Sequence, residues 1–490
     1  KICMETKTKQ LLNRNFTGKE QQYPIKVLQF GEGNFLRAFV DYAFYRLNNE
    51  LSFNAGIAVV QPLEGGMVDL IEKQDGLYTL FLNGIKNKQP IQDIYLIDDI
   101  VKCVNPYKKF QDYLEIAKSD SLEFVISNTT EAGIEFIDSD TPDMKPPKSF
   151  PAKLAVFLYE RYCFFKGDIS KGLAIIPCEL INYNADTLKK VLLQYCDLWN
   201  LEADFKNWLN EACTFHNTLV DRIVPGYPRN EIEEYNSKID YQDNILVTAE
   251  PFFLWVIEGD DKLKEKLPFH KIDLDVKIVK DMQPYRTRKV RILNGAHTAM
   301  VPFSIMYGNE TVKETLEDTY TGDFVSNVIF NEINPVLELD SEEKKQFAEE
   351  VLDRFRNPFI KHLLSDIALN SISKFKVRVL PTVLEYIKIN QKLPPYLTFS
   401  LACLIRFYKK EWNGNQLPVK DTQDIVDFFD QTWKSGNVKE VVSKTLGNTE
   451  FWEQDLNQIE GLTEAIEFAL QQIETSGITE GFINYKAKYL

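Results

Sequence analysis

The stretch over residues 25–44 limits the possible folds of this chain more than any other. Residues 25–30 form a short apolar run, which is typical of a buried strand. Gly31-Glu32-Gly33-Asn34 follows, and apolar residues then recur at helical spacing over 35–44. A strand, a Gly-x-Gly turn and a helix predict a unit where a pyrophosphate approaches the backbone at the helix start. Because the third glycine of the full dinucleotide fingerprint is missing, an ordinary strand-to-helix turn is the alternative.

The same stretch supplies most of the predicted contacts to a dinucleotide cofactor: Phe30, Gly31, Gly33, Asn34 and Phe35. A second strand over 56–61 ends at Gln61, where a ribose-binding acid is usual, and Glu64 is close by. We therefore include Gln61 among the cofactor contacts. No lysine or arginine occurs between Arg46 and Lys73 to neutralise a 2′-phosphate, which favours NAD over NADP.

Two further segments are expected to contact the cofactor. The strand at 123–127 runs into a polar turn that contains Thr130 and Glu131, and open α/β sheets bind ligands at strand carboxyl ends. A helix cap explains this turn equally well. Asp221, next to Arg222 in an apolar stretch, is the other predicted contact, with a structural ion pair as the alternative.

The chain changes character near residue 284. Strands and helices alternate before it, and residues 77–82 and 91–96, which flank Asn83-Gly84, predict an inserted antiparallel hairpin. Helical periodicity follows over 309–318, 322–338, 341–355, 358–370, 376–389, 396–410, 421–435 and 456–473. A chain of 490 residues should hold at least two domains, because cores split beyond about 250–300 residues. We predict α/β plus all-α: a Rossmann-type NAD-binding domain with insertions over 1–284, then a mostly helical substrate and catalytic domain over 285–490.

A lysine, an asparagine and a histidine follow the predicted boundary at K-x4-N-x2-H spacing: Lys289, Asn294 and His297. At about 100° per residue on an α-helix, Asn294 lies roughly 140° from Lys289, with His297 between them. All three side chains can therefore face one cleft. A proton donor, an oxyanion donor and an imidazole suit carbonyl and alcohol chemistry. The alternative is a solvated lysine and a structural histidine.

Bulk composition excludes several classes of partner. The 57 basic and 72 acidic residues leave a net charge of −15, which argues against nucleic acid and anionic membranes. No apolar run approaches the ~18 residues of a membrane span, and we expect no signal peptide. Seven scattered cysteines without Cys-x-x-Cys predict reduced thiols and a cytoplasmic location. Four histidines lie at no metal-ligand spacing, so we expect no catalytic metal: His216, His270, His297 and His362.

These motifs together resemble the long-chain polyol dehydrogenases, the mannitol dehydrogenase family. The resemblance spans about residue 10 to the end, and its carriers are 31–38, 74–79, 130–133, 220–223 and 289–297. The branch that reduces tagaturonate is the most similar, through 127–134, 176–181 and 357–362. The resemblance implies a Rossmann-type domain, a helical C-terminal domain and no catalytic metal. It also implies a catalytic Lys289, an oxyanion-binding Asn294 and a supporting His297.

The chain departs from the mannitol dehydrogenases at two places. They carry Cys-Asp-Asn where this chain has Cys178-Glu179-Leu180, so Asn182 or Asn184 is a possible substitute for the second oxyanion amide. They carry an acid where this chain has Arg286, three residues before the lysine, which favours an anionic substrate. The resemblance also places Lys374 at the substrate. The predicted substrate-binding residues are therefore Arg286, Lys374 and Asn184.

The resemblance implies the reversible, NADH-dependent reduction of D-tagaturonate to D-altronate in hexuronate catabolism. The expected partners are a keto-uronate and its aldonate, and we expect a monomer or weak homo-oligomer. The nearest alternatives are related enzymes acting on fructuronate, mannitol or a sugar phosphate. An NAD-binding regulator without turnover is the remote alternative.

Overall fold

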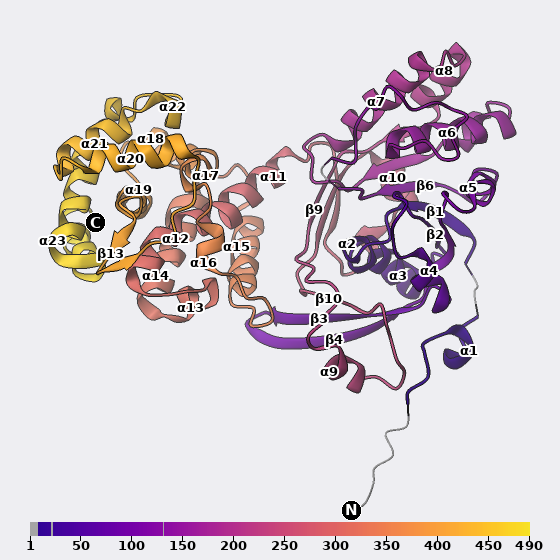
Figure 1. Cartoon of the computed structure of the whole chain (residues 1–490), viewed down its shortest axis with the longest axis horizontal. Coiled ribbons are helices and arrows are strands. Elements are labelled where there is room, and N and C mark those ends of the chain that lie inside the picture. The colour runs from indigo at the N-terminus through magenta and orange to yellow at the C-terminus, as the bar shows by residue number, and fades with distance from the viewer. Residues whose placement is uncertain (1–7, 21–22, 131) are drawn as a thin grey trace, which may run out of the picture. The chain divides into compact units, whose positions relative to one another are not determined.

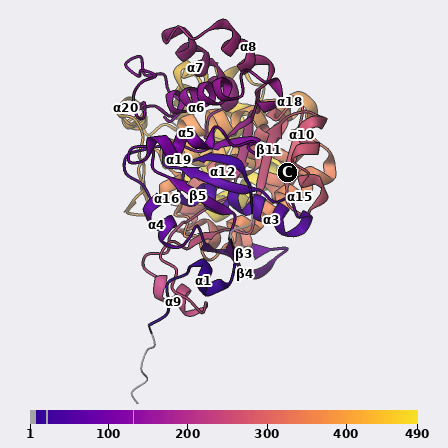
Figure 2. The same cartoon turned by 90° about the vertical axis from the view of Figure 1, so that its right-hand side faces the viewer.

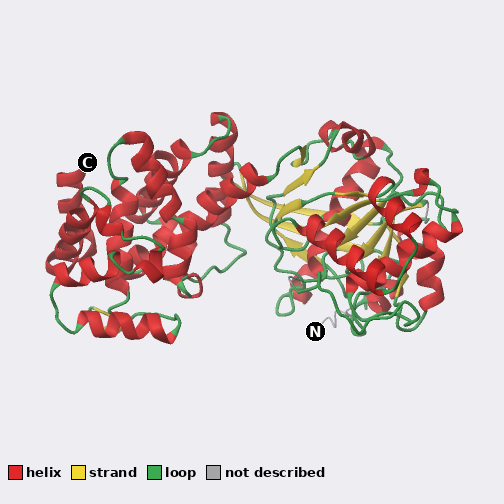
Figure 3. Cartoon of the chain, turned by 90° about the horizontal axis from the view of Figure 1, so that it is seen from above, coloured by secondary structure: helices red, strands yellow, loops and turns green. Residues whose placement is uncertain are grey.

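The computed structural model describes residues 8–20, 23–130 and 132–490, which form two compact units (Figure 1). The first unit contains the described residues up to Asn83 together with Pro90–Met282, and the second contains Gly84–Gln89 and Gln283–Leu490. Figure 3 shows strands mostly in the first unit and helices throughout the second. The predicted fold class, α/β followed by all-α, is confirmed.

A six-stranded sheet organises the first unit. Its order is β5-β2-β1-β6-β7-β8, and every neighbouring pair is parallel. The strands are β1 (Ile25–Phe30), β2 (Gly56–Val60), β5 (Ile100–Val104), β6 (Phe124–Ser127), β7 (Ala174–Pro177) and β8 (Thr214–Phe215). The strand order reverses beside β1, because β2 lies on one side of it and β6 on the other. Open α/β sheets bind ligands in the crevice at such a point.

Helices cover both faces of this sheet. One face carries α2 (Asn34–Ala38), α3 (Val40–Leu51) and α4 (Val68–Lys73). The other carries α5 (Phe110–Ile116), α6 (Phe150–Phe164), α7 (Asn184–Leu198) and α8 (Ala203–Glu211) (Figure 2). Because side chains of a strand alternate between faces, Val27 belongs to the first core and Leu28 to the second. The sheet is therefore buried on both sides, as parallel sheets are.

The helix predicted after the Gly-x-Gly turn is interrupted at Phe39, whose φ is −124° and ψ −79°. The Tyr78 hydroxyl donates to the carbonyl of Arg37 at 2.6 Å. The guanidinium of Arg222 donates to the carbonyl of Ala38 at 2.8 Å. Two carbonyls at the break thus bond outside the helix, which stabilises its early end.

The predicted hairpin is present, but its turn lies elsewhere. β3 (Tyr78–Lys86) and β4 (Gln89–Ile97) are neighbours in a second sheet, and β3 runs through the predicted turn at Asn83-Gly84. The connection is Asn87-Lys88, whose φ values of 51° and 65° fit a type I′ turn. The sequence misplaced the turn because Asn-Gly is the stronger local signal.

Smaller elements complete the first unit. A third sheet has the order β12-β11-β9, and β10 pairs in parallel with β3. These elements are α1 (Arg14–Thr17), β9 (Thr218–Asp221), α9 (Ile232–Ser237), β10 (Val247–Ala249), β11 (Leu254–Glu258), α10 (Asp261–Lys266) and β12 (Val276–Val279).

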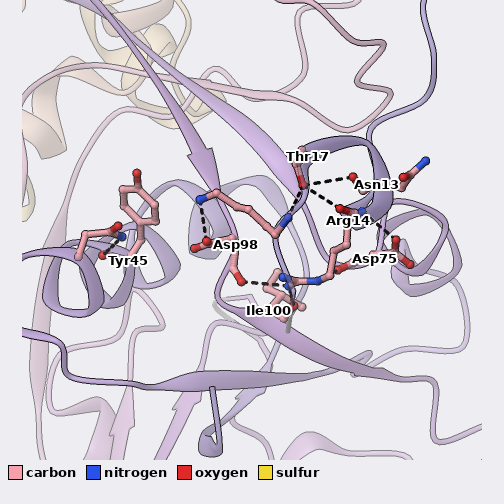
Figure 4. Close-up of polar contacts among 9 residues, drawn as sticks. Asn13, Arg14, Thr17, Tyr45, Asp75, Asp98 and Ile100 are labelled. Atoms are coloured by element: carbon pink, nitrogen blue, oxygen red, sulfur yellow. Dashed lines mark hydrogen bonds and ion pairs between the residues drawn. The ribbon is translucent and has the colours of Figure 1, made fainter. Parts of the chain in front are cut away.

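The N-terminal arm is bound to the first unit by two cations (Figure 4). The Arg14 guanidinium donates to the carbonyls of Asp75 at 3.1 Å, Asp98 at 3.0 Å and Ile100 at 3.3 Å. Lys19 pairs with the Asp98 carboxylate at 2.8 Å. These contacts bind residues 14–19 to the rest of this unit.

The second unit begins with a continuous helical run: α11 (Gln283–Lys289), the π-helical turn η3 (Val290–Asn294) and α12 (Gly295–Tyr307). The remaining elements are α13 (Val312–Glu317), α14 (Thr319–Asn327), η4 (Val328–Ile333), α15 (Ser341–Phe355), α16 (Leu364–Ile367), α17 (Ser371–Arg378), α18 (Leu380–Asn390), α19 (Pro395–Phe407), β13 (Glu411–Trp412), β14 (Asn415–Gln416), α20 (Gln423–Trp433), α21 (Val438–Leu446), α22 (Thr449–Trp452) and α23 (Leu462–Tyr489). The helix predicted over 358–370 is mostly loop, with α16 as its one helical turn. Among the described residues, no helix is long and apolar enough to cross a membrane.

Candidate active site

The Gly-x-Gly turn lies at the carboxyl end of β1, beside the end of β6. Gly31 has a φ of 122°, and a Cβ there would lie 2.8 Å from the carbonyl oxygen of Asn128. Only glycine fits this position. Gly33 is different, because its φ of −69° suits any residue. A Cβ added there would have no heavy atom of the described residues within 4 Å, apart from those of its two chain neighbours. The fold requires the first glycine, whereas the second leaves open space beside the backbone.

Arg37 supports this turn from the protein interior. Its buried guanidinium donates to the Glu32 carbonyl at 3.0 Å, to Asn34 Oδ1 at 2.9 Å and to the Ile245 carbonyl at 2.6 Å. Asn34, a predicted cofactor contact, thus has its amide oxygen bound to Arg37. Sequence reasoning did not single out Arg37, although an arginine among apolar helix residues was a usable signal.

The two phenylalanines among the predicted cofactor contacts are held by aromatic packing. Phe30 is fully buried, with its ring 6.1 Å from Tyr113 and 4.8 Å from Phe150, so its side chain belongs to the core. Only the Phe30 backbone can serve a ligand at the turn. Phe35 is partly buried and stacks on Phe39 at 5.0 Å.

Gln61 organises the loop after β2. Its buried amide Nε2 donates to the carbonyls of Leu63 at 2.9 Å and Glu64 at 2.8 Å. Its Oε1 accepts from the Val68 backbone N–H at 3.3 Å. The Gln61 side chain therefore shapes the loop, while the Glu64 side chain at the tip is exposed.

Glu179 shapes the turn after β6, although in the sequence it stands out only as a departure from the family. Its buried carboxylate accepts from the Ser127 hydroxyl at 3.0 Å and from the Thr129 N–H at 3.2 Å and hydroxyl at 3.1 Å. Burial raises the pKa of Glu179, against the lowering effect of these bonds. Thr130 follows with a φ of 106°, which is rare for a residue other than glycine. Glu131 lies outside the described residues.

The prediction that Asn184 binds substrate is corrected by its contacts. The side chain is fully buried, and its Nδ2 donates to the carbonyls of Pro177 at 3.0 Å and Glu179 at 3.1 Å. Its Oδ1 accepts from the backbone N–H of Thr218 at 3.0 Å and of Ala185 at 2.9 Å. The amide joins the start of α7 to the ends of two strands and is not available to an oxyanion.

Asp221 is buried at the end of β9, and the arginine beside it is a structural residue. The Arg222 guanidinium lies over the rings of Tyr42 at 4.9 Å and Phe253 at 4.8 Å. It donates to three backbone carbonyls, those of Ala38, Pro251 and Phe252. The cofactor role of Asp221 stays a prediction.

Lys289, Asn294 and His297 lie on the continuous run α11–η3–α12, each partly exposed. The α-helical projection of these residues needs correction, because the π turn pairs residues five apart. Asn294 therefore lies near one turn above Lys289 rather than roughly 140° round from it. π turns within α-helices occur frequently at functional sites.

Arg288 anchors α11 immediately before Lys289. Its guanidinium is only 2% exposed and pairs with Glu343 at 3.5 Å. It also lies over the rings of Phe347 at 4.1 Å and Tyr285 at 5.2 Å. Because neighbouring helical residues point about 100° apart, burial of Arg288 turns Lys289 away from the core.

His297 has apolar and cationic surroundings. Its ring stacks on Phe355 at 4.4 Å and meets His362 edge-on at 5.6 Å. Its Nε2 is buried and has no hydrogen-bond partner within the part of the chain that the structure describes. Burial lowers the pKa of His297 well below its ordinary value, as do His362 and the cations Arg354, Arg378 and Lys374. The imidazole is therefore neutral at pH 7.

Three cations of α11 and α17 have different surroundings. The charge of Lys374 helps to lower the pKa of His297, and its Nζ donates to the Ile367 carbonyl at 2.8 Å. Burial and a neighbouring arginine lower its pKa. Lys376 pairs with Glu453 at 2.6 Å instead. Arg286 lies on α11 and is partly exposed.

Sequence reasoning missed Arg354 and His362 as neighbours of His297. Arg354 lies on α15 and is only 7% exposed, while His362 lies in the loop before α16. A buried arginine in a charged helix gave no periodic signal. Among residues 8–20, 23–130 and 132–490, no three His, Cys, Asp or Glu side chains are grouped as a metal site.

Comparison with known proteins identifies the family. Residues 25–271 match the Mannitol dehydrogenase Rossmann domain, and residues 281–474 match the Mannitol dehydrogenase C-terminal domain. The chain belongs to the mannitol dehydrogenase family. Altronate oxidoreductase from Bacillus subtilis (strain 168) is 45% identical over 478 residues, covering 97% of this chain and 98% of that protein. Altronate oxidoreductase from Yersinia enterocolitica is 44% identical over 483 residues, covering 97% and 100%.

Two solved structures share the fold of this mannitol dehydrogenase family member. A D-sorbitol dehydrogenase in substrate-free form has a TM-score of 0.79 at 18% identity, covering 96% of this chain and 99% of its own. The Pseudomonas fluorescens mannitol 2-dehydrogenase, in a ternary complex with NAD and D-mannitol, has a TM-score of 0.63 at 20% identity, covering 98% and 100%. At these identities, the similarity concerns the fold alone.

Proposed function

We propose that this chain is an NAD-dependent oxidoreductase that interconverts D-tagaturonate and D-altronate. The observation that carries the proposal is the 45% identity to an altronate oxidoreductase over nearly the whole of both chains. The cations around His297 support it, because both sugar acids carry a carboxylate that needs a positive partner.

The turn after β1 fits a dinucleotide. Gly31 lets β1 and the end of β6 approach closely, and the open space over Gly33 gives a pyrophosphate access to backbone N–H groups. Arg37 and Glu179 keep the two neighbouring turns in shape. The absence of basic residues between Arg46 and Lys73 in the sequence favours NAD over NADP.

In the proposed mechanism, bound NADH supplies the hydride that reduces the keto carbon. Protonated Lys289 donates a proton to the oxygen of that carbonyl, and neutral Lys289 accepts it back in the oxidation direction. The amide of Asn294 donates a hydrogen bond to the same oxygen as negative charge develops on it. The neutral imidazole of His297 orients a substrate hydroxyl through its Nε2. This nitrogen is buried and has no hydrogen-bond partner among the described residues.

The test is a substrate panel followed by NADH oxidation at 340 nm. The panel holds D-tagaturonate, D-fructuronate, the uncharged ketoses D-tagatose and D-fructose, and a ketose phosphate. The proposal expects the highest kcat/KM with D-tagaturonate, and with NAD⁺ and D-altronate in reverse. A higher kcat/KM with any other member of the panel would replace the proposed substrate with that one.

A further inference from the structure

Helix α17 carries two cations toward the histidine of the proposed active site. We propose that Arg378, together with Lys374, binds the carboxylate of the sugar acid and so separates a uronate from an uncharged ketose. This inference rests on the proposed function. It assigns carboxylate recognition to a different element from Arg286, the residue that the sequence indicated.

The geometry of α17 places both side chains on one face. Lys374 and Arg378 are four residues apart in Ser371–Arg378, so they are neighbours on the helix surface. The end of α17 packs closely on the start of α12, since a Cβ at Gly295 would lie 3.1 Å from the Arg378 carbonyl oxygen. Gly295 is two residues before His297, and the charges of Arg378 and Lys374 both act on that histidine.

Arg378 lacks an anionic partner of its own. Its guanidinium is partly buried and makes no hydrogen bond or ion pair with residues 8–20, 23–130 or 132–490. Burial removes part of the water that solvates the Arg378 charge, and this lowers the pKa of Arg378. Asp421 partly offsets the charge of Lys374, but its carboxylate also accepts the Tyr408 hydroxyl. A partly desolvated cation without a counter-charge is what an anionic ligand stabilises.

The surroundings of His297 concentrate positive charge in an acidic protein. The charge of Arg354 lowers the pKa of both His297 and His362. The protein as a whole, in contrast, has a net charge of −15. Like charges held together cost free energy unless an anion joins them. The planar guanidinium of Arg378 can bind a carboxylate through two parallel hydrogen bonds, with Lys374 as a second donor. A phosphate would satisfy the same cations, so the experiment must separate the two anions.

The experiment compares Arg378→Gln with wild type on D-tagaturonate and on D-tagatose, its uncharged counterpart. We expect kcat/KM for the uronate to fall about 10- to 100-fold, the loss typical of a charge-assisted hydrogen bond, mainly through KM. We expect kcat/KM for D-tagatose to change less than about threefold. Arg378→Lys keeps the charge but not the two-pronged geometry, so it should recover part of the loss. Lys376→Gln is the matched control, because this cation of the same helix pairs with Glu453, and it should match wild type.

Several results would overturn the inference. An equal loss on both substrates, at an unchanged melting temperature, would assign Arg378 to the fold or to catalysis. An unchanged uronate rate in Arg378→Gln, with the loss appearing in Arg286→Gln, would return carboxylate recognition to α11. A higher kcat/KM of the wild-type protein with a ketose phosphate than with the uronate would mean that these cations bind a phosphate group. If Arg378→Gln fails to fold, Lys374→Gln must show the same selective loss or the inference fails. Wild type inactive on every keto-uronate would refute the proposed function itself, which is a distinct result.

Discussion

Asp41 on α3 is a buried carboxyl group with too few partners, and it predicts a defined pH dependence of stability. It is fully buried, and its Oδ2 accepts from Gln29 at 3.2 Å. Its Oδ1, and both carboxyl oxygens of nearby Asp99, have no hydrogen-bond partner among the described residues. Burial raises the pKa of Asp41 to about 7, although Gln29, Arg37 and Tyr78 lower it.

The sign of the effect follows from this raised pKa. The folded protein binds the proton of Asp41 more tightly than the unfolded chain, where the ordinary value is 3.8. The stabilisation is therefore complete below about pH 4 and is lost as the pH rises through 7. A shift of about three pH units corresponds to at most about 4 kcal/mol in the free energy of unfolding. About 2–3 kcal/mol of this is lost between pH 5 and pH 8.

The assay is urea denaturation of wild type and Asp41→Asn at pH 5 and pH 8. Asparagine cannot ionise, so wild type should lose more stability than the variant between the two pH values, by up to about 2–3 kcal/mol. Asp69→Asn is the control, because Asp69 is exposed and pairs with Lys108, and its pH dependence should follow wild type. Equal losses in wild type and Asp41→Asn would refute the reasoning.

Three further predictions concern the proposed cofactor and metal chemistry. Gly33→Val should leave the melting temperature unchanged, because its Cβ has open space, yet weaken NADH binding ~10-fold or more by blocking the approach to the backbone; unchanged binding in a titration would exclude this turn from the cofactor site. NADH should give a higher kcat/KM than NADPH, because no lysine or arginine occurs between Arg46 and Lys73, and the opposite preference would contradict that argument. EDTA should leave turnover unchanged, and activity lost to EDTA and restored by Zn²⁺ would show that a metal is needed.

The sequence predicted the elements whose signals are local. The strand before Gly31, the glycine turn and the change of periodicity near residue 284 each depend on neighbouring residues, and the structure contains them. The K-x4-N-x2-H spacing of Lys289, Asn294 and His297 was likewise visible in the sequence, and their catalytic roles stay a prediction. Their relative directions were not, because an α-helical projection has no term for the π turn at Val290–Asn294.

Long-range polar contacts were beyond a reading of the sequence. Asn184 looked available for substrate, but its partners Pro177 on β7 and Thr218 on β9 fill its hydrogen-bonding capacity. Arg354 gave no sign of its place beside His297, since 57 positions separate them in the chain and only the packing of α15 brings them together. Charged and amide side chains can be assigned to a binding site only when their hydrogen-bond and ion-pair partners are known.

The most direct test of the account is the turnover of wild type and Lys289→Ala with D-tagaturonate and NADH, with NADH affinity measured in parallel. The account predicts that wild type forms D-altronate and that the variant loses at least ~10²-fold in kcat, the range for a lost general acid. NADH affinity should stay close to wild type, because the turn after β1 is intact in the variant. Near-normal turnover in Lys289→Ala would contradict the central claim that this lysine transfers the proton.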